Sequence, residues 1–538
     1  MCNLLMPKKS FRVELTLARP SGYQSFKKYS YSRQTHPHQP KSRQKNSPSS
    51  TADALLLLPP LSMLCFSLSA DALLLLHRHC SALAPPSLPR PRLDLLMQIL
   101  RMKVLFFFLL LLAAGHRCAA VASSEDAAYM HLLAAATGAD GTLGWKAGTD
   151  PCDGGWAGVR CELGRVTGIS VRAKGLAGSV PDAANGSLSA LEDLDLGNNK
   201  VSGRLPILLL PQLTYLWLDG NLFTSMPETF FSGMPLLQVF NLTDNPISAW
   251  TLPDDRRSLR SLHVLEASNA GIVGSLDVIF TNTTAGFPFP SLDAVCFAGN
   301  RMVGTPPDMR GGVITKLDLS KNLFSGPISF ISGVASSIQH LKLSHNEFSG
   351  ELPDFTDFAW LGLLSLDHNK ITGVVPASLP QLSRITAVNL AGNLLQGPLP
   401  EFGKYVVTDL AEAAAVGSFC RLDRGPCDPE VTALLSIAGA LAFPLIIARS
   451  WLRNDACAGW IGVHCDSQRR VTGINLSRLG LNGSLNSAFG SLLWLQVISM
   501  SGNNLRGEIP ESVARLPSLR VLDVADKATT SSKARCQR

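Results

Sequence analysis

The sequence lacks the motifs of a catalytic domain. No Gly-rich phosphate loop follows a predicted strand, and no HRD-type or DFG-type kinase tripeptide occurs in the 538 residues. Cys152 and Cys161 have no second Cys or His pair at zinc-ligand spacing that could complete a metal site with them. We therefore expect no catalytic residue, no cofactor and no metal site.

An excess of positive charge is absent from most of the chain, although the formal net charge is +7. Residues 1–101 contain 14 Lys and Arg against 4 Asp and Glu, whereas residues 102–538 contain 34 against 37. Because the basic excess lies outside the repeats described below, the charge gives no reason to expect a nucleic-acid partner.

Long uninterrupted apolar runs are also scarce. Pro59 and Pro60 end the run Leu55–Leu58, and the run Val431–Ala448 is interrupted by Pro444 among other residues. A membrane-spanning helix needs about 20 predominantly apolar residues, so both runs are poor candidates.

A secretory signal peptide is predicted at residues 102–122. A basic start at Met102-Lys103 precedes the apolar run LFFFLLLLAAG and the small-x-small site Ala120-Val121-Ala122. Such signals stand at an N-terminus, so residues 1–101 are interpreted as a basic low-complexity extension, disordered or derived from an upstream gene prediction. The alternative is that the whole extension is translated.

A repeated motif organises the remainder of the chain. Ile338–Pro353, IQHLKLSHNEFSGELP, fits the template L-x-x-L-x-L-x-x-N of the leucine-rich repeat. The Asn position recurs in steps of 22–30 residues, with Ala at position 270 and an insert at 281–290; its positions are 199, 221, 245, 270, 300, 322, 346, 369 and 393. The pattern predicts an α/β solenoid, a right-handed leucine-rich-repeat superhelix in two blocks.

Each block begins with a predicted disulfide cap. Cys152 and Cys161 flank Trp156, and Cys457 and Cys465 flank Trp460 in the same arrangement. Cys420 and Cys427 form a third expected bridge. The predicted divisions are a cap at 123–164, repeats at 165–403, a non-repeat island with the second cap at 404–469, repeats at 470–526 and a divergent tail at 527–538.

The two caps carry a resemblance to a known family. The motifs DPC-x3-W-x-GV-x-C and DAC-x2-W-x-GV-x-C, with a non-repeat island between the blocks, resemble the ectodomain of the transmembrane-kinase (TMK) subfamily of plant leucine-rich-repeat receptor kinases. The resemblance covers Ala127 to Val524 and implies a cell-surface receptor ectodomain linked to auxin and growth signalling. The membrane span and kinase of that family are missing from this sequence.

The candidate ligand-binding residues lie in the early repeats. Side chains that flank the buried leucines of each strand should face outward on the concave sheet. There the pattern places two aromatics among acidic residues, an arrangement that favours an interface anchor: Tyr215, Trp217, Asp195, Asp219 and Glu266. His340, His345 and His368 are interpreted as solvated residues of this face or its loops.

Five N-glycosylation sequons support passage through the secretory pathway; they are Asn185, Asn241, Asn282, Asn475 and Asn482. Cys296 has no short-range mate, so it is either a free thiol or pairs with Cys536.

The leading hypothesis is a secreted or cell-surface module that binds an extracellular protein, peptide or small molecule, or pairs with full-length receptor kinases of the same family. Two alternatives remain open. The chain could be a truncated part of a receptor serine/threonine kinase, or an inert gene product.

Overall fold

The computed structural model describes residues 121–183, 186–252, 259–280, 289–410, 418–421, 423 and 425–525. The extension 1–101, nearly all of the predicted signal peptide, residues 281–288 of the predicted insert and the tail 527–538 lie outside these residues, as do the sequons at Asn185 and Asn282.

The first described element is the helical part of the N-terminal cap, α3 (Ser124–Thr137) followed by α4 (Ala139–Thr142). The hydroxyl of Ser123 accepts a hydrogen bond from the amide of Asp126 and so caps α3. Gly138 ends the helix at φ +67°, a conformation that glycine adopts without a Cβ clash. The indoles of Trp145 and Trp156 then stack with centroids 5.1 Å apart.

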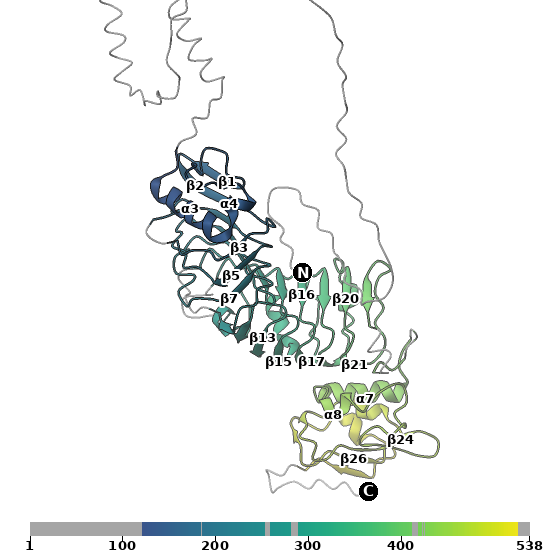
Figure 1. Cartoon of the computed structure of the whole chain (residues 1–538). Coiled ribbons are helices and arrows are strands. Elements are labelled where there is room, and N and C mark those ends of the chain that lie inside the picture. The colour runs from purple at the N-terminus through teal and green to yellow at the C-terminus, as the bar shows by residue number, and fades with distance from the viewer. Residues whose placement is uncertain are drawn as a thin grey trace, which may run out of the picture. The chain divides into compact units, whose positions relative to one another are not determined.

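The strands of the predicted repeats form the main sheet, which has twelve strands among the described residues (Figure 1). β1 (Val159–Glu162) is antiparallel to β2 (Arg165–Ser170), and each later strand is parallel to the one before it. The later strands are β4 (Asp193–Asp195), β6 (Tyr215–Trp217), β8 (Val239–Asn241), β10 (Val264–Glu266), β12 (Ala294–Cys296), β14 (Lys316–Asp318), β16 (His340–Lys342), β18 (Leu363–Ser365), β20 (Ala387–Asn389) and β22 (Val407–Asp409).

The central residue of each strand explains the register of this sheet. Leu194 of β4 is paired with Leu216 of β6, and Leu216 with Phe240 of β8. All three side chains are buried, and the same stacking continues through Leu341 and Leu364. A slip of one residue would turn this apolar row outward, so burial sets the register. The sheet also extends to β22, beyond the predicted end of the first repeats at residue 403.

The other edge of the coils also forms short parallel strands. A seven-stranded sheet contains β9 (Trp250–Thr251), β11 (Ile272–Gly274), β13 (Arg301–Gly304), β15 (Leu323–Pro327), β17 (Glu347–Glu351), β19 (Lys370–Val374) and β21 (Leu394–Gln396). A smaller sheet contains β3 (Ala177–Gly178), β5 (Lys200–Arg204) and β7 (Leu222–Ser225). Helical turns in this block are α5 (Asp277–Phe280), η1 (Ile328–Val334) and η2 (Leu379–Gln381).

The recurring asparagines of the repeats stack into a ladder of side-chain hydrogen bonds. The amide of Asn199 donates to the carbonyl of Leu196 at 2.8 Å, and the amide of Asn221 in the next coil donates to the same carbonyl at 2.9 Å. The oxygen of Asn221 accepts from the amide of Val201 at 3.1 Å. Where two successive coils both carry the asparagine, they thus share a buried turn carbonyl, which satisfies backbone groups that no strand pairs.

The structure explains how the repeat with Ala270 tolerates the loss of one ladder residue. The carbonyl of Leu242 still accepts a hydrogen bond from the side-chain amide of Asn245, and the carbonyl of Ala267 accepts one from the side-chain amide of Asn300. The amide of Ile247, which a ladder oxygen would otherwise accept, donates instead to the carbonyl of Asn245 at 2.8 Å. Each group retains one partner.

The second block repeats the plan of the first. Its cap contains α7 (Pro429–Ala440) and α8 (Leu445–Ala448), and the rings of Trp451 and Trp460 stack at 5.5 Å. Its strands are β23 (Val463–Cys465), β24 (Val471–Asn475), β26 (Val497–Ser499) and β28 (Val521–Asp523), with β25 (Asn482–Gly483) and β27 (Asn504–Leu505) on the other edge; η3 (Ser487–Ser491) and α9 (Glu511–Ala514) complete it. Within the described residues no helix is long and apolar enough to cross a membrane.

Three predicted disulfides are confirmed: Cys152–Cys161 in the first cap, Cys420–Cys427 before α7 and Cys457–Cys465 in the second cap. Cys296 lies buried in β12 and is disulfide-bonded, so the expected alternative of a free thiol is wrong. Cys536, the predicted partner, lies outside the described residues.

Candidate functional site

The two predicted aromatic residues lie together on the outward face of the main sheet. Tyr215 and Trp217 flank the buried Leu216 in β6, and both are partly exposed. Their rings stack in parallel, with centroids 5.4 Å apart and planes 4° apart. Because alternate residues of a strand share a face, the short strand holds the pair in one orientation. The pair presents a rigid apolar surface.

The acidic residues beside the pair are not uncompensated charges. Arg172 contacts Asp195 at 3.0 Å and Asp219 at 2.7 Å, which joins three successive coils. The hydrogen bond to Asp219, followed by that to Asp195, raises the pKa of the guanidinium against the opposing effect of burial. The predicted acidic surroundings are therefore partly neutralised by an arginine that was not among the predicted site residues.

Glu266 is also paired. One carboxylate oxygen lies 3.4 Å from the ammonium of Lys316, and the other accepts from the amide nitrogen of Asn241 at 3.0 Å. Burial raises the pKa of Glu266, and Lys316 opposes that shift. Glu266 lies two strands from Trp217, since β8 separates β6 from β10.

Charge pairing continues along the sheet, where Lys342 of β16 lies 3.8 Å from Asp318 of β14. His340 is on the same strand, and burial followed by the charges of Lys316 and Lys342 lowers its pKa. Lys316 and Lys342 occupy outward positions of β14 and β16, so strand alternation could have indicated them, whereas Arg172 follows the end of β2. Their partners depend on the register between coils.

The described sequons differ in their surroundings. The side chain of Asn241 is buried and its nitrogen donates to buried Glu266, so this sequon is poorly accessible for a glycan. Asn475 in β24 and Asn482 in β25 are exposed. Whether any of these residues is glycosylated stays a prediction.

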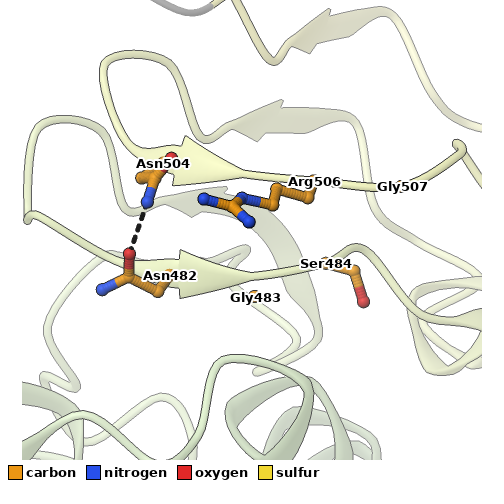
Figure 2. Close-up of a pocket in the computed structure, with 6 residues that line it drawn as sticks. All are labelled: Asn482, Gly483, Ser484, Asn504, Arg506 and Gly507. Carbon is orange, nitrogen blue, oxygen red and sulfur yellow. Dashed lines mark hydrogen bonds between the residues drawn. The ribbon is translucent and has the colours of Figure 1, made fainter.

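Asn482 lies in a shallow hollow of about 460 Å³ in the second block (Figure 2); its lining residues are Asn482, Gly483, Ser484, Asn504, Arg506 and Gly507. The amide of Asn504 donates to the side-chain oxygen of Asn482 at 2.7 Å. Figure 2 shows the nitrogen of Asn482 pointing away from Asn504. The hollow contains an exposed sequon, and its lining includes one guanidinium, from Arg506, but no carboxylate, imidazole or thiol.

Family-model comparisons match both caps and parts of both blocks. The leucine rich repeat N-terminal domain matches residues 131–162 and 427–466, and the leucine-rich-repeat model matches residues 337–357 and 494–516. The second cap, inferred from its likeness to the first, is thus matched by the same domain model.

Two curated plant proteins match about two thirds of the chain. The receptor-like kinase TMK2 of Arabidopsis thaliana is 35% identical over 384 residues, which cover 69% of this chain and 42% of the relative. The receptor protein kinase WSS1 of Oryza sativa subsp. japonica is 36% identical over 372 residues, covering 68% of this chain and 39% of the relative. The match thus spans less than half the length of these relatives.

Among solved structures, a plant ice-binding protein matches at a TM-score of 0.48 and 21% identity, with coverage of 57% of this chain and 98% of that chain. The caps, the repeats and the kinase relatives together identify the family. Over the matched region, this chain is a plant leucine-rich-repeat receptor-like-kinase ectodomain of the type found in the TMK proteins.

Proposed function

We propose that this chain is an extracellular ligand-binding module, the receptor-like ectodomain of cell-surface growth or auxin-type signalling, and that it binds without catalysing a reaction. The curated relatives are named as receptor kinases, and the match with this chain consists of caps and repeats. The proposed location is the secretory pathway and then the outer face of the plasma membrane or the extracellular space.

The observation that carries this proposal is the stacked pair of Tyr215 and Trp217. Large aromatic side chains bury much apolar area and lose little rotamer entropy when they bind, which makes them frequent interface anchors. Arg172 forms ion pairs with Asp195 and Asp219 beside the pair and offsets one of their two negative charges. The surface therefore suits a mostly apolar group of a protein, a peptide or a small molecule.

The test measures binding to the tag-free secreted chain by surface plasmon resonance. The probes are the ectodomains of Arabidopsis TMK2 and TMK4 and a panel of synthetic secreted plant peptides. We expect Trp217→Ala to weaken binding of at least one probe by tenfold or more, since truncating an interface anchor costs roughly 2 kcal/mol or more.

Trp360→Ala is the matched control. Trp360 is 48% exposed and lies under the guanidinium of Arg384, away from the β6 pair in sequence and outside the main-sheet strands. Its loss should leave probe binding unchanged. Equal binding by the wild type and Trp217→Ala, or no probe binding at micromolar concentration, would contradict the proposal.

A second candidate is a part of a longer receptor serine/threonine kinase, which the length of the relatives favours because this chain covers 42% of TMK2. Sequencing full-length transcripts from the locus tests it. A reading frame that continues from the second block into a kinase domain supports this candidate.

A further inference from the structure

Three potential metal ligands gather on two successive coils. His345 follows β16, and Asp367 and His368 follow β18. Their ligand atoms all lie within 4.8 Å of one another, and the described part of the chain holds no other group of this kind. Asp367 and His368 are neighbours in the chain, but His345 lies 22 positions before Asp367, so only the stacking of coils brings it to the other two.

The scaffold holds both imidazoles in place. His345 and His368 directly precede the ladder residues Asn346 and Asn369, and their φ angles are +56° and +55°. The amide nitrogen of His345 donates to the carbonyl of Asp367 at 2.9 Å. The two rings stack with centroids 4.2 Å apart and planes 13° apart, so a rotation of one or both side chains would be needed to aim both nitrogens at one ion. A non-glycine residue in this left-handed conformation costs roughly 1–2 kcal/mol, which the surrounding ladder must offset.

The carboxylate of Asp367 is oriented by hydroxyl groups. Ser344 and Ser365 both donate to its Oδ1, while Oδ2 lies 3.1 Å from Nδ1 of His368 and 3.7 Å from Nε2 of His345. The two serine hydroxyls lie outside the ligand set and fix the orientation of the carboxylate, as outer hydrogen bonds do in metal sites.

We propose that His345, Asp367 and His368 form a binding site for one Zn²⁺ ion. Zinc ligands at 2.0–2.2 Å in tetrahedral geometry lie roughly 3.3 Å apart, a value between the two ligand separations of 3.1 and 3.7 Å. The side chains of His345 and His368 are 46% and 43% exposed, so a fourth position would be open to water. Two imidazoles and a carboxylate suit Zn²⁺ better than Ca²⁺ or Mg²⁺, which prefer oxygen ligands.

Isothermal titration calorimetry of the tag-free chain with ZnCl₂ tests this site. We expect one ion per chain in the wild type and at least tenfold weaker binding in His345→Asn, His368→Asn and Asp367→Asn. Asparagine suits the two histidine positions because it tolerates positive φ while removing the imidazole. His340→Asn, on the same coil but outside the cluster, is the matched control and should bind Zn²⁺ as the wild type does.

Two further measurements separate loss of the site from loss of the fold. The unfolding midpoint of the wild type should rise with Zn²⁺, whereas the double variant His345→Asn/His368→Asn should keep its metal-free midpoint at every concentration. Co²⁺ added to the wild type should give the visible absorption of a four- or five-coordinate site. A wild type without saturable Zn²⁺ binding or this Co²⁺ absorption would overturn the proposal, as would a double variant with wild-type affinity. Either result would leave a cluster held by hydrogen bonds alone.

Discussion

At the scale of single residues, the side-chain nitrogen and the side-chain oxygen of a ladder asparagine contribute differently to stability. The nitrogen of Asn322 donates to the carbonyls of Phe297 and Leu319, which also receive Asn300 and Asn346 respectively. The oxygen of Asn322 accepts from the amide of Met302 at 3.0 Å. Only that buried amide depends on Asn322 alone.

Asn322→Ala should therefore lower the free energy of unfolding by about 2 kcal/mol, the usual cost of an unsatisfied buried donor together with lost hydrogen bonds. Urea denaturation followed by circular dichroism measures the loss as a shift of the midpoint. Asn504→Ala is the control, because Asn504 is exposed and its amide binds only Asn482; its cost should be about 0.5 kcal/mol or less. Equal losses would refute this assignment.

At the scale of elements, the two caps use different carboxylates for the same contact. In the first cap Asp126 is buried and accepts from Arg165 at 2.9 Å and from the amides of Val166 and Leu188. In the second cap Glu430 accepts from the amide of Val471, while Arg470 pairs with Asp466 instead. The Asp126 carboxylate of the first cap is therefore paired with an arginine, whereas the Glu430 carboxylate of the second cap is not.

The difference shows in the pKa values. Burial raises the pKa of Asp126, but the hydrogen bonds from Arg165, Val166 and Leu188 outweigh it, so the pKa is lowered from 3.8. Burial dominates at Glu430, and its pKa is raised from 4.5. A lowered folded-state pKa contributes stability that is present above the unfolded value and is lost as the pH falls through the folded value.

Asp126→Asn should thus destabilise the chain by about 2–3 kcal/mol at neutral pH, and the difference from the wild type should be lost as the pH falls below the lowered pKa of the Asp126 carboxyl. Thermal or urea unfolding across the acid range measures this convergence. Glu430→Gln is the contrasting variant: its raised pKa means that the ionised form is disfavoured in the folded state. A deficit for Glu430→Gln that vanishes in acid like that of Asp126→Asn would argue against the contrast between the caps.

At the scale of the whole molecule, the exposure of each sequon predicts which of them carry glycans after passage through the secretory pathway. Asn475 and Asn482 are exposed on the second block, and the nitrogen of Asn482 points away from its hydrogen-bonded neighbour (Figure 2). We expect both to be modified in chain secreted from plant cells, as measured by glycopeptide mass spectrometry. Asn475→Gln and Asn482→Gln should each remove one glycan, whereas Asn504→Gln, outside any sequon, should remove none. Unmodified Asn475 and Asn482 in the secreted chain would contradict this prediction.

The sequence by itself determined the repeats, the ladder and both caps. The leucine spacing predicts which side of each coil is buried. The Trp and Cys spacing of the first cap recurs around Trp460 and predicts the second cap. The three short disulfides followed from the same local spacing. These features depend on residues that are near in sequence, so periodicity alone was sufficient.

Only the tertiary structure decided which side chains of adjacent coils are in contact. Arg172 forms ion pairs with the predicted acidic residues Asp195 and Asp219, and Asp367 contacts two histidines that were expected to be solvated. The coils differ in length by several residues, and the side-chain partners across them depend on the register in which their buried strands pair. That register is set by packing of the apolar core, which a linear spacing rule does not contain.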